Sequence, residues 1–278
     1  MRQVQKKKRE RRLNFNPQTQ NIIWCTRKTN SLNKYIIKLV SLFHYSYTKM
    51  KNKKNPPSVL VIIPTLNEEW GLDPTIKEIK HYLQKTSILV VDGRSIDSTI
   101  KVAKSLGAKV ILQKGSGKGD AIAIAIQNCK EQKVEYLALI DADFTYPAVY
   151  FDRMLEILIK NPQVGMLCGN RLKAKVQFGD TFNKFQIGNK ILSNLHNFLN
   201  GVNLEDPLTG LRVIRWSIIK DWKPKSKGFD IEVELNHFIK KSGFNIVEIP
   251  IDYRTRIGKK KLGIRHGLTI LKRIILQI

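Results

Sequence analysis

The sequence predicts an α/β protein of Rossmann-like type, in which helices flank a mainly parallel sheet. Short apolar runs rich in β-branched residues alternate four times with segments that carry helix signals. The runs are continuous rather than alternating, as expected of strands that are covered on both faces. Each run ends in a polar cluster, which is typical of the carboxyl edge where α/β proteins bind their ligands.

Two strand–helix units open this pattern. The apolar run 59–63 is the first strand, and Asp73-Pro74, an N-cap with proline at the first helical position, begins its helix. The run 88–91 is the second strand, and the helix after it stops at Gly107, a common C-terminal helix signal.

The third and fourth units carry the most distinctive loops. Strand 109–112 precedes the glycine-rich loop 115–119. Residues 121–126 alternate like a strand, but the loop before them and their alanines favour a helix. Strand 136–140 ends in Asp141-Ala142-Asp143, and a helix over 150–159 completes the unit.

The second half of the chain is less regular but still alternates. Its predicted elements are a strand at 164–168, helices at 182–199 and 230–241, strands at 213–214 and 245–249, and an amphipathic segment at 266–278.

Asp141 and Asp143 predict a metal–diphosphate site at the end of strand 136–140. Mg²⁺ keeps several waters and usually takes only one or two carboxylates together with substrate phosphates. An Asp-x-Asp triplet also arises by chance in solvated turns, so the hypothesis depends on the other motifs.

The formal charge of +26 points to an anionic partner: a membrane surface, a nucleic acid or a phosphorylated substrate. More than half of the excess lies in residues 1–57, where Glu10 is the one acidic residue. The three scattered cysteines argue against a zinc site or disulfides and for a reducing compartment. We see no run of eighteen apolar residues and no signal peptide.

Residues 1–57 are predicted to be a basic N-terminal extension. Residues 1–12 should be disordered, whereas 32–47 has the spacing of a basic amphipathic helix on a membrane surface. That segment could equally pack on the body or lack structure. Met50 looks like a natural start, so residues 1–49 are either an added arm or a mis-assigned start.

Six motifs, in order, resemble family 2 glycosyltransferases of the GT-A fold, most closely the dolichyl/polyprenyl-phosphate sugar synthases. They are PxxNE from Pro64, DGRSIDST from Asp92, the GKG loop around Lys118, the DAD triplet, DPLTGLR from Asp206 and YRTRxG…KL from Tyr253. The similarity covers residues 58–262, the predicted GT-A domain, and leaves 263–278 as a C-terminal amphipathic segment.

The resemblance implies a donor site for a nucleotide-sugar. The implied nucleotide-sugar contacts are Pro64, Glu68, Asp92, Lys118, Ala142, Arg256 and Lys261. Glu68 and Asp92 would accept hydrogen bonds from base and ribose, although taken alone they also fit a helix-start carboxylate and a turn former. Asp97 should be mainly structural. The GKG loop is not a Walker sequence, which disfavours a P-loop ATPase.

The resemblance also implies Mg²⁺ or Mn²⁺ on Asp141 and Asp143. Thr145 stands where some relatives have glutamine, and its hydroxyl could serve as a further ligand. Arg256 and Lys261 correspond to a basic pair that clamps the leaving diphosphate. A solvated basic face is the simpler explanation of Lys259 and Lys260.

On the acceptor side, Arg171 would meet a lipid phosphate, with Asn170 in place of a frequent serine. A second arginine expected some fourteen residues later is absent; Asn183 or Lys184 is nearest, and lysine binds phosphate only as a point charge. If the acceptor is instead a sugar hydroxyl, Asp206 is the leading candidate for the base, although its motif also fits a capping role.

The predicted function is therefore inverting transfer of a hexose, from a GDP-mannose or UDP-glucose type of donor, to a dolichyl/polyprenyl phosphate. The alternatives are a GT-A enzyme with a sugar-hydroxyl or protein-linked acceptor, a nucleotidyltransferase, which the missing GxGxR loop disfavours, and a basic nucleic-acid-binding protein. No nucleic acid is expected, because the basic block lies outside the predicted domain and RNA-binding signatures are lacking.

We predict a cytoplasmic protein held peripherally at the inner face of the cell membrane. The segment 266–278 has apolar residues on one face with basic residues beside them, which suits an anionic surface. The residues are Leu268, Leu271, Ile274 and Ile275, with Lys272 and Arg273. A last helix packed on the domain is the alternative.

Overall fold

The computed structural model describes residues 56–173, 181–259, 261 and 263–276. All of them belong to one compact unit, Lys49–Ile278. Nearly all of the predicted N-terminal extension, including the helix expected at 32–47, lies outside the described residues.

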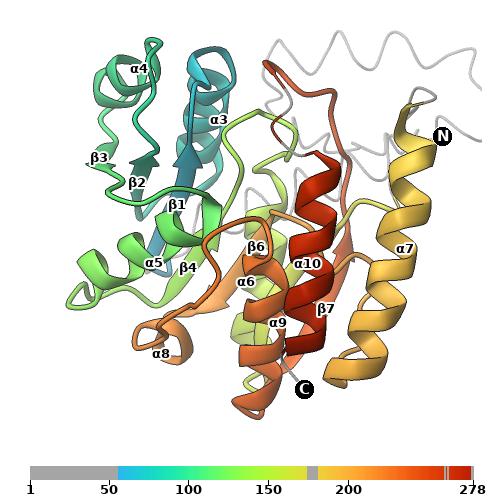
Figure 1. The fold of residues 1–278 in the computed structure, drawn as a ribbon. Coiled ribbons are helices and arrows are strands. Elements are labelled where there is room, and N and C mark those ends of the chain that lie inside the picture. Colours follow the sequence, from blue (N-terminus) through green and yellow to red (C-terminus); the bar gives the residue numbers. More distant parts are fainter. Residues whose placement is uncertain (1–55, 174–180, 260, 262, 277–278) are drawn as a thin grey trace, which may run out of the picture. The chain divides into compact units, whose positions relative to one another are not determined.

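A seven-stranded sheet in the order β3-β2-β1-β4-β6-β5-β7 forms the centre of the fold (Figure 1). The strands are β1 (Val59–Thr65), β2 (Thr86–Asp92), β3 (Lys109–Leu112), β4 (Tyr136–Leu139), β5 (Val164–Asn170), β6 (Arg212–Arg215) and β7 (Asn245–Pro250). Neighbouring strands run parallel except at β6, which is antiparallel to both β4 and β5. The predicted mainly parallel sheet is confirmed, and the insertion of β6 was not foreseen.

Helices cover both faces of this sheet. They are α3 (Glu69–Tyr82), α4 (Thr99–Ser105), α5 (Lys118–Cys129), α6 (Tyr150–Lys160), α7 (Thr181–Asn200), α8 (Trp216–Ile219), α9 (Ile231–Lys241) and α10 (Ile264–Leu276). Along β1, Val59, Val61 and Ile63 pack against α3, α4 and α6, whereas Leu60 and Ile62 pack against the layer of α5, α8 and α9. This alternation explains the continuous apolar run, because every side chain from Val59 to Ile63 is buried.

Most predicted boundaries lie within two residues of the observed ones. The start predicted for the first helix at Asp73-Pro74 is wrong, because α3 begins at Glu69 and contains Pro74. The segment 121–126, ambiguous between strand and helix, lies within α5. The short helix α8 was missed, because four residues are too few for a helical period to show.

The C-terminal helix α10 packs on α7 and α9, in a small apolar cluster of its own. Ile270 and Ile274 are buried there beside Val233 of α9. The alternative prediction, a last helix packed on the domain, is therefore confirmed. The predicted apolar face is divided, since Ile274 is buried while Leu268 and Ile275 are 67% and 50% exposed. Arg273 is not a free surface cation either, since it forms an ion pair with Asp230.

None of the helices in the described part of the chain is long and apolar enough to cross a bilayer.

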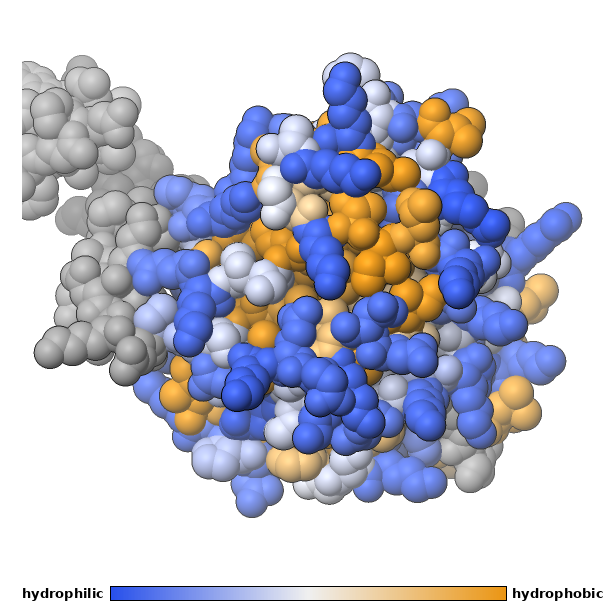
Figure 2. All heavy atoms as spheres, turned by 90° about the vertical axis from the view of Figure 1, so that its left-hand side faces the viewer, coloured by the Kyte–Doolittle hydropathy of each residue, from blue (hydrophilic) through white to orange (hydrophobic). Residues whose placement is uncertain are grey.

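β3 forms one edge of the sheet, and its last residue, Leu112, is 56% exposed. The face of the molecule on this side shows an apolar area framed by hydrophilic side chains (Figure 2).

Candidate active site

The loops after β1, β2 and β4 meet at the carboxyl edge of the sheet and carry the candidate site. Each contains one non-glycine residue with positive φ: Asn67 at 50°, Arg94 at 68° and Phe144 at 62°. Such residues cost free energy unless the surroundings enforce them, and they tend to occur where side chains must be aimed. Here they turn the chain sharply next to Glu68, Asp92 and Asp143.

Asp141 faces the GKG loop. Its Oδ1 lies 2.6 Å from Nζ of Lys118, at the start of α5. On another side it packs on Gly210 of the DPLTG turn so tightly that an added Cβ would lie 2.5 Å from Oδ2. The turn motif therefore has a physical role, since it holds the Asp141 carboxylate in place.

Asp143 is buried, and each of its oxygens has a partner. Oδ1 accepts hydrogen bonds from the Thr145 hydroxyl at 2.6 Å and from the Thr145 backbone N–H, while Oδ2 pairs with Nη1 of Arg256 at 2.5 Å. Burial and the neighbouring Asp141 raise the pKa of Asp143, against the opposing effect of Thr145 and Arg256. The Thr145 hydroxyl, predicted as a further metal ligand, thus donates a hydrogen bond to Asp143.

Glu68, in the loop after β1, pairs with Arg256 and Lys261 near the C-terminal end of the chain. Its Oε1 accepts from both Arg256 and Lys261, so that Arg256 bridges Glu68 and Asp143. Burial raises the pKa of Glu68, while Lys261 and Arg256 act against this rise. Residues almost 200 positions apart in the sequence are thereby brought to one place, as the family resemblance implied.

Asp92 closes β2 in a fully buried position. Its carboxylate accepts from the Thr65 hydroxyl and from the backbone and hydroxyl of Ser95. Asp97 accepts from the backbone and hydroxyl of Thr99 and from the backbone of Glu69, which confirms its structural role. Pro64 lies in β1 opposite Val91, and Ala142 is buried, its carbonyl against Gly71 of α3.

A second group of side chains surrounds Arg171. Asp206 accepts from Nε and Nη2 of Arg171, both at 2.7 Å, and from its backbone N–H at 2.9 Å. The guanidinium lies 5.4 Å from the ring centroid of Tyr253, which meets Tyr146 edge-on. The hydroxyl of Tyr146 accepts from the backbone N–H of Gly210, the residue that packs on Asp141. The two tyrosines therefore connect the Arg171 pair to the Asp-x-Asp loop.

Four side chains of the candidate site were not singled out in the sequence. Glu232 of α9 forms a 2.7 Å ion pair with Lys118, and Glu248 of β7 accepts from the backbone of Glu205 and Asp206. Tyr253 lies beside Arg171, and Tyr146 packs against Tyr253. Tyr146 and Tyr253 stand inside or beside quoted motifs and could have been found there. Glu232 and Glu248 had no signal, because their partners are set by tertiary packing alone.

Several predicted residues are not brought into the site. Lys259 is exposed, as its assignment to a solvated face implied, and Lys260 lies outside the described residues. The side chains of Asn183 and Lys184 also lie outside what the structure describes.

The two aspartates fit a divalent cation that also needs substrate oxygens. Within the described ranges, no cluster of three or more histidine, cysteine, aspartate or glutamate side chains could hold a metal ion. Two hard carboxylates in one loop still match the donor set that Mg²⁺ uses with phosphates. Lys118 pairs with Oδ1 of Asp141, and Arg256 pairs with Oδ2 of Asp143. These carboxylate oxygens are also the ones that would bind a metal ion.

Taken together, the sheet and the acidic loop flanked by basic side chains define a nucleotide-diphospho-sugar transferase of the GT-A fold. The sequence model of glycosyl transferase family 2 matches residues 60–222, and the chain belongs to this family.

Relatives and solved structures agree with this assignment. The glycosyltransferase AglJ of Haloferax volcanii is 30% identical to this chain. The match covers 72% of this chain and 64% of AglJ. A dolichyl-phosphate hexose transferase of the same organism is 30% identical over 76% of this chain and 92% of its own. Polyprenol monophosphomannose synthase of Mycolicibacterium smegmatis is 27% identical over 73% and 80% of the respective chains.

The fold is also that of a solved enzyme. Glucosyl-3-phosphoglycerate synthase from Mycobacterium tuberculosis, in complex with Mn²⁺, UDP-glucose and phosphoglyceric acid, superposes with a TM-score of 0.64. The match covers 84% of this chain and 83% of that one at 16% identity, so it supports the fold alone. Another structure of that enzyme holds Mg²⁺ and UDP.

Proposed function

We propose that the protein is an inverting hexosyltransferase that moves a sugar from a nucleotide-sugar to a dolichyl or polyprenyl phosphate. Two of the relatives are named for this class of acceptor. The donor in this proposal is of the GDP-mannose or UDP-glucose type.

The pairing of Arg171 with Asp206 is the observation that carries the acceptor assignment. Asp206 uses both carboxylate oxygens on Arg171, so it is poorly placed to take a proton from a sugar hydroxyl. In our proposal it is a positioning residue. It occupies one edge of the guanidinium and leaves Nη1, which donates to none of the described residues, for an anionic acceptor.

A lipid phosphate suits such a site because it is already a nucleophile and needs no general base. Arg171 and the rings of Tyr146 and Tyr253 would orient it. Attack in a single displacement inverts the anomeric centre, and the leaving group is a nucleoside diphosphate.

Charge on the departing diphosphate is then the main demand on the site. Arg256, Lys261 and Lys118 are the cationic side chains at hand, and their pairs with Glu68, Asp143 and Asp141 hold them in place. We assign Asp141 and Asp143 to a divalent cation, Mg²⁺ or Mn²⁺, which when bound would add to this neutralisation. Thr145 would orient Asp143 rather than bind the cation directly.

On the nucleotide side, we assign Glu68 and Asp92 to the base and ribose, with Pro64 and Ala142 as backbone walls. Their carboxylates are suitable acceptors, since Asp92 is fixed by Thr65 and Ser95.

We also place the protein at an anionic membrane surface on the cytoplasmic side. The outer face of α10 supports this, because exposed Leu268, Ile275 and Leu276 lie among exposed Arg265 and Lys272. A lipid acceptor has to be reached at such a surface.

The test is release of nucleoside diphosphate from UDP-glucose, GDP-mannose or UDP-N-acetylglucosamine, with Mg²⁺ or Mn²⁺. Each donor is offered with a polyprenyl phosphate, with the matching polyprenol, or without acceptor. We expect release with one donor and only with the phosphate. Asp143→Ala and Arg256→Ala should abolish it, while Lys259→Ala, an exposed cation of the same segment, should not.

Equal release with the polyprenol would overturn the phosphate acceptor but keep the transferase. Failure of every donor to bind would overturn the enzyme assignment itself.

A further inference from the structure

Lys118 is shared between two carboxylates that come from different parts of the fold. Its Nζ lies 2.6 Å from Oδ1 of Asp141 and 2.7 Å from Oε1 of Glu232. The lysine side chain is 10% exposed and that of Glu232 is 7% exposed, whereas Asp141 is 31% exposed. One ammonium thus serves a buried partner and a more open one.

The backbone around Lys118 is fixed by the segment that leads into α9. A Cβ on Gly117 would lie 2.3 Å from the carbonyl oxygen of Lys227, and one on Gly119 would lie 2.2 Å from that of Ser226. The backbone N–H of Gly119 also donates to the carbonyl of Gly228. The close contact explains the glycines on either side of Lys118 and sets the lysine opposite Glu232, at the start of α9.

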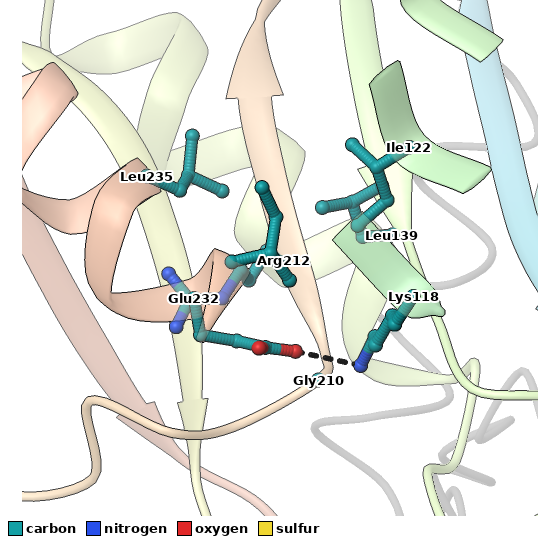
Figure 3. A pocket seen from close by; sticks show the side chains of 8 residues that line it. Lys118, Ile122, Leu139, Gly210, Arg212, Glu232 and Leu235 are labelled. Carbon is teal, nitrogen blue, oxygen red and sulfur yellow. Dashed lines mark ion pairs between the residues drawn. The ribbon is translucent and has the colours of Figure 1, made fainter. Parts of the chain in front are cut away.

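Among the described residues, Lys118 is the cationic partner of Glu232. The neighbouring Arg212 is fully buried, and its donors go to neutral acceptors: the carbonyls of Pro207 and Thr209 and the side chain of Asn236. Lys118, Glu232 and Arg212 line a small pocket whose other side chains are largely apolar (Figure 3). Ile122, Leu139 and Leu235 lie there around the facing Lys118 and Glu232. In such surroundings a carboxylate holds its cation strongly.

We propose that Glu232 is a positioning residue that holds Lys118 in the site when Asp141 binds a divalent cation. This inference rests on the proposed function, in which Asp141 binds that cation. Lys118 and the metal ion compete for the same oxygen, and Glu232 draws the ammonium away without letting it leave the site. Lys118 then stays beside the diphosphate as an anchored cation.

The test measures Mn²⁺ affinity, in the presence of UDP or GDP, from the electron paramagnetic resonance signal of free Mn²⁺. In Glu232→Gln the ammonium has Asp141 as its one remaining carboxylate, so Mn²⁺ should bind about tenfold more weakly, as for other residues that orient a metal ligand. Glu135→Gln is the control: this glutamate accepts from the backbone and hydroxyl of Ser58, at the opposite end of β4 from Asp141. It should keep the affinity of the unchanged protein.

A double-mutant cycle separates the proposed role from a general effect of charge or stability. Removing the competitor in Lys118→Met frees Asp141, so adding Glu232→Gln to that variant should leave the Mn²⁺ affinity unchanged. A further loss in the double variant would overturn the proposal, as would an unaltered affinity in Glu232→Gln.

If Glu232→Gln does not fold, Lys118→Met and the double variant still decide the matter. Removing both members of a buried pair is usually tolerated better than removing one. The absence of Mn²⁺ binding in the unchanged protein would contradict the proposed metal site itself, an outcome distinct from any difference among the variants.

Discussion

Arg171 and Asp206 form a unit, so neither can be assigned a role from its own substitution. Three hydrogen bonds join the two residues. Arg171→Met removes the guanidinium, and Asp206→Asn weakens the contact that holds the guanidinium in position. We expect each variant to lower kcat/KM for polyprenyl phosphate roughly 10- to 100-fold. The double variant should be little worse than the poorer single one.

A pair of similar geometry serves as the control. Arg254 makes a two-point contact with Glu78 at 2.7 and 2.8 Å. Arg254→Met should change the stability but not the acceptor KM. Losses that add up in the Arg171/Asp206 double variant would mean that the two residues act independently.

His196 gives the packing of α7 on α9 a pH dependence. The ring is fully buried, and its Nε2 accepts from the side-chain amide of Asn236. Burial, with smaller effects of Arg212 and His237, lowers its pKa from 6.5 to about 4. The unfolded chain therefore binds the proton more tightly, and the free energy of unfolding should fall as the pH drops from about 6.5 to 4.

The measurement is urea unfolding of the unchanged protein and of His196→Gln over this pH range. Glutamine keeps an acceptor for Asn236 but does not titrate, so the fall with pH should be smaller in the variant. Equal slopes would exclude His196 as the titrating group.

Adjacent isoleucines of α10 separate packing from surface binding. Ile274 is buried against α9, and Ile275 is half exposed. Ile274→Ala should lower the free energy of unfolding by about 2–5 kcal/mol. Ile275→Ala should change it little but weaken co-sedimentation with anionic vesicles. The opposite assignment of the two effects would reverse the orientation of the helix.

At the scale of elements, the sequence was informative where a signal is local. Continuous apolar runs and glycine boundaries are read within a few residues, so β1 to β4 and the presence of α3 to α6 could be predicted. The Asp73-Pro74 signal misplaced the start of α3, which begins at Glu69. The pairing of β6 between β4 and β5 could not, because a four-residue strand gives no indication of its neighbours or direction. Likewise Glu232 is an ordinary helix-start acid until α9 is placed beside Lys118.

The burial of Ile274 could not be predicted for the same reason. Helical spacing placed Ile274 with Leu268 and Ile275, but which part of an amphipathic face is buried depends on the neighbouring helices. Ile274 packs against Val233 of α9, and Arg273 pairs with Asp230, just before the same helix.

For the molecule as a whole, charge should govern membrane binding. The chain has a formal charge of +26, and exposed charges are screened over about 8 Å at 0.15 M salt but about 3 Å at 1 M. We expect co-sedimentation with phosphatidylserine-containing vesicles to fall steeply with NaCl, and phosphatidylcholine vesicles to bind weakly throughout. Binding that ignores both salt and lipid charge would point to apolar contacts alone.

The antiparallel strand β6 also bears on how the protein is made. β4, which leads into Asp141 and Asp143, gains its second neighbour only from residues 212–215. While the ribosome is still adding the intervening segment, this strand is an open sheet edge, and such edges invite pairing with other chains. Synthesis that pauses before residue 212 should therefore leave a nascent chain in which the β4 edge, next to the Asp141–Asp143 loop, is uncovered.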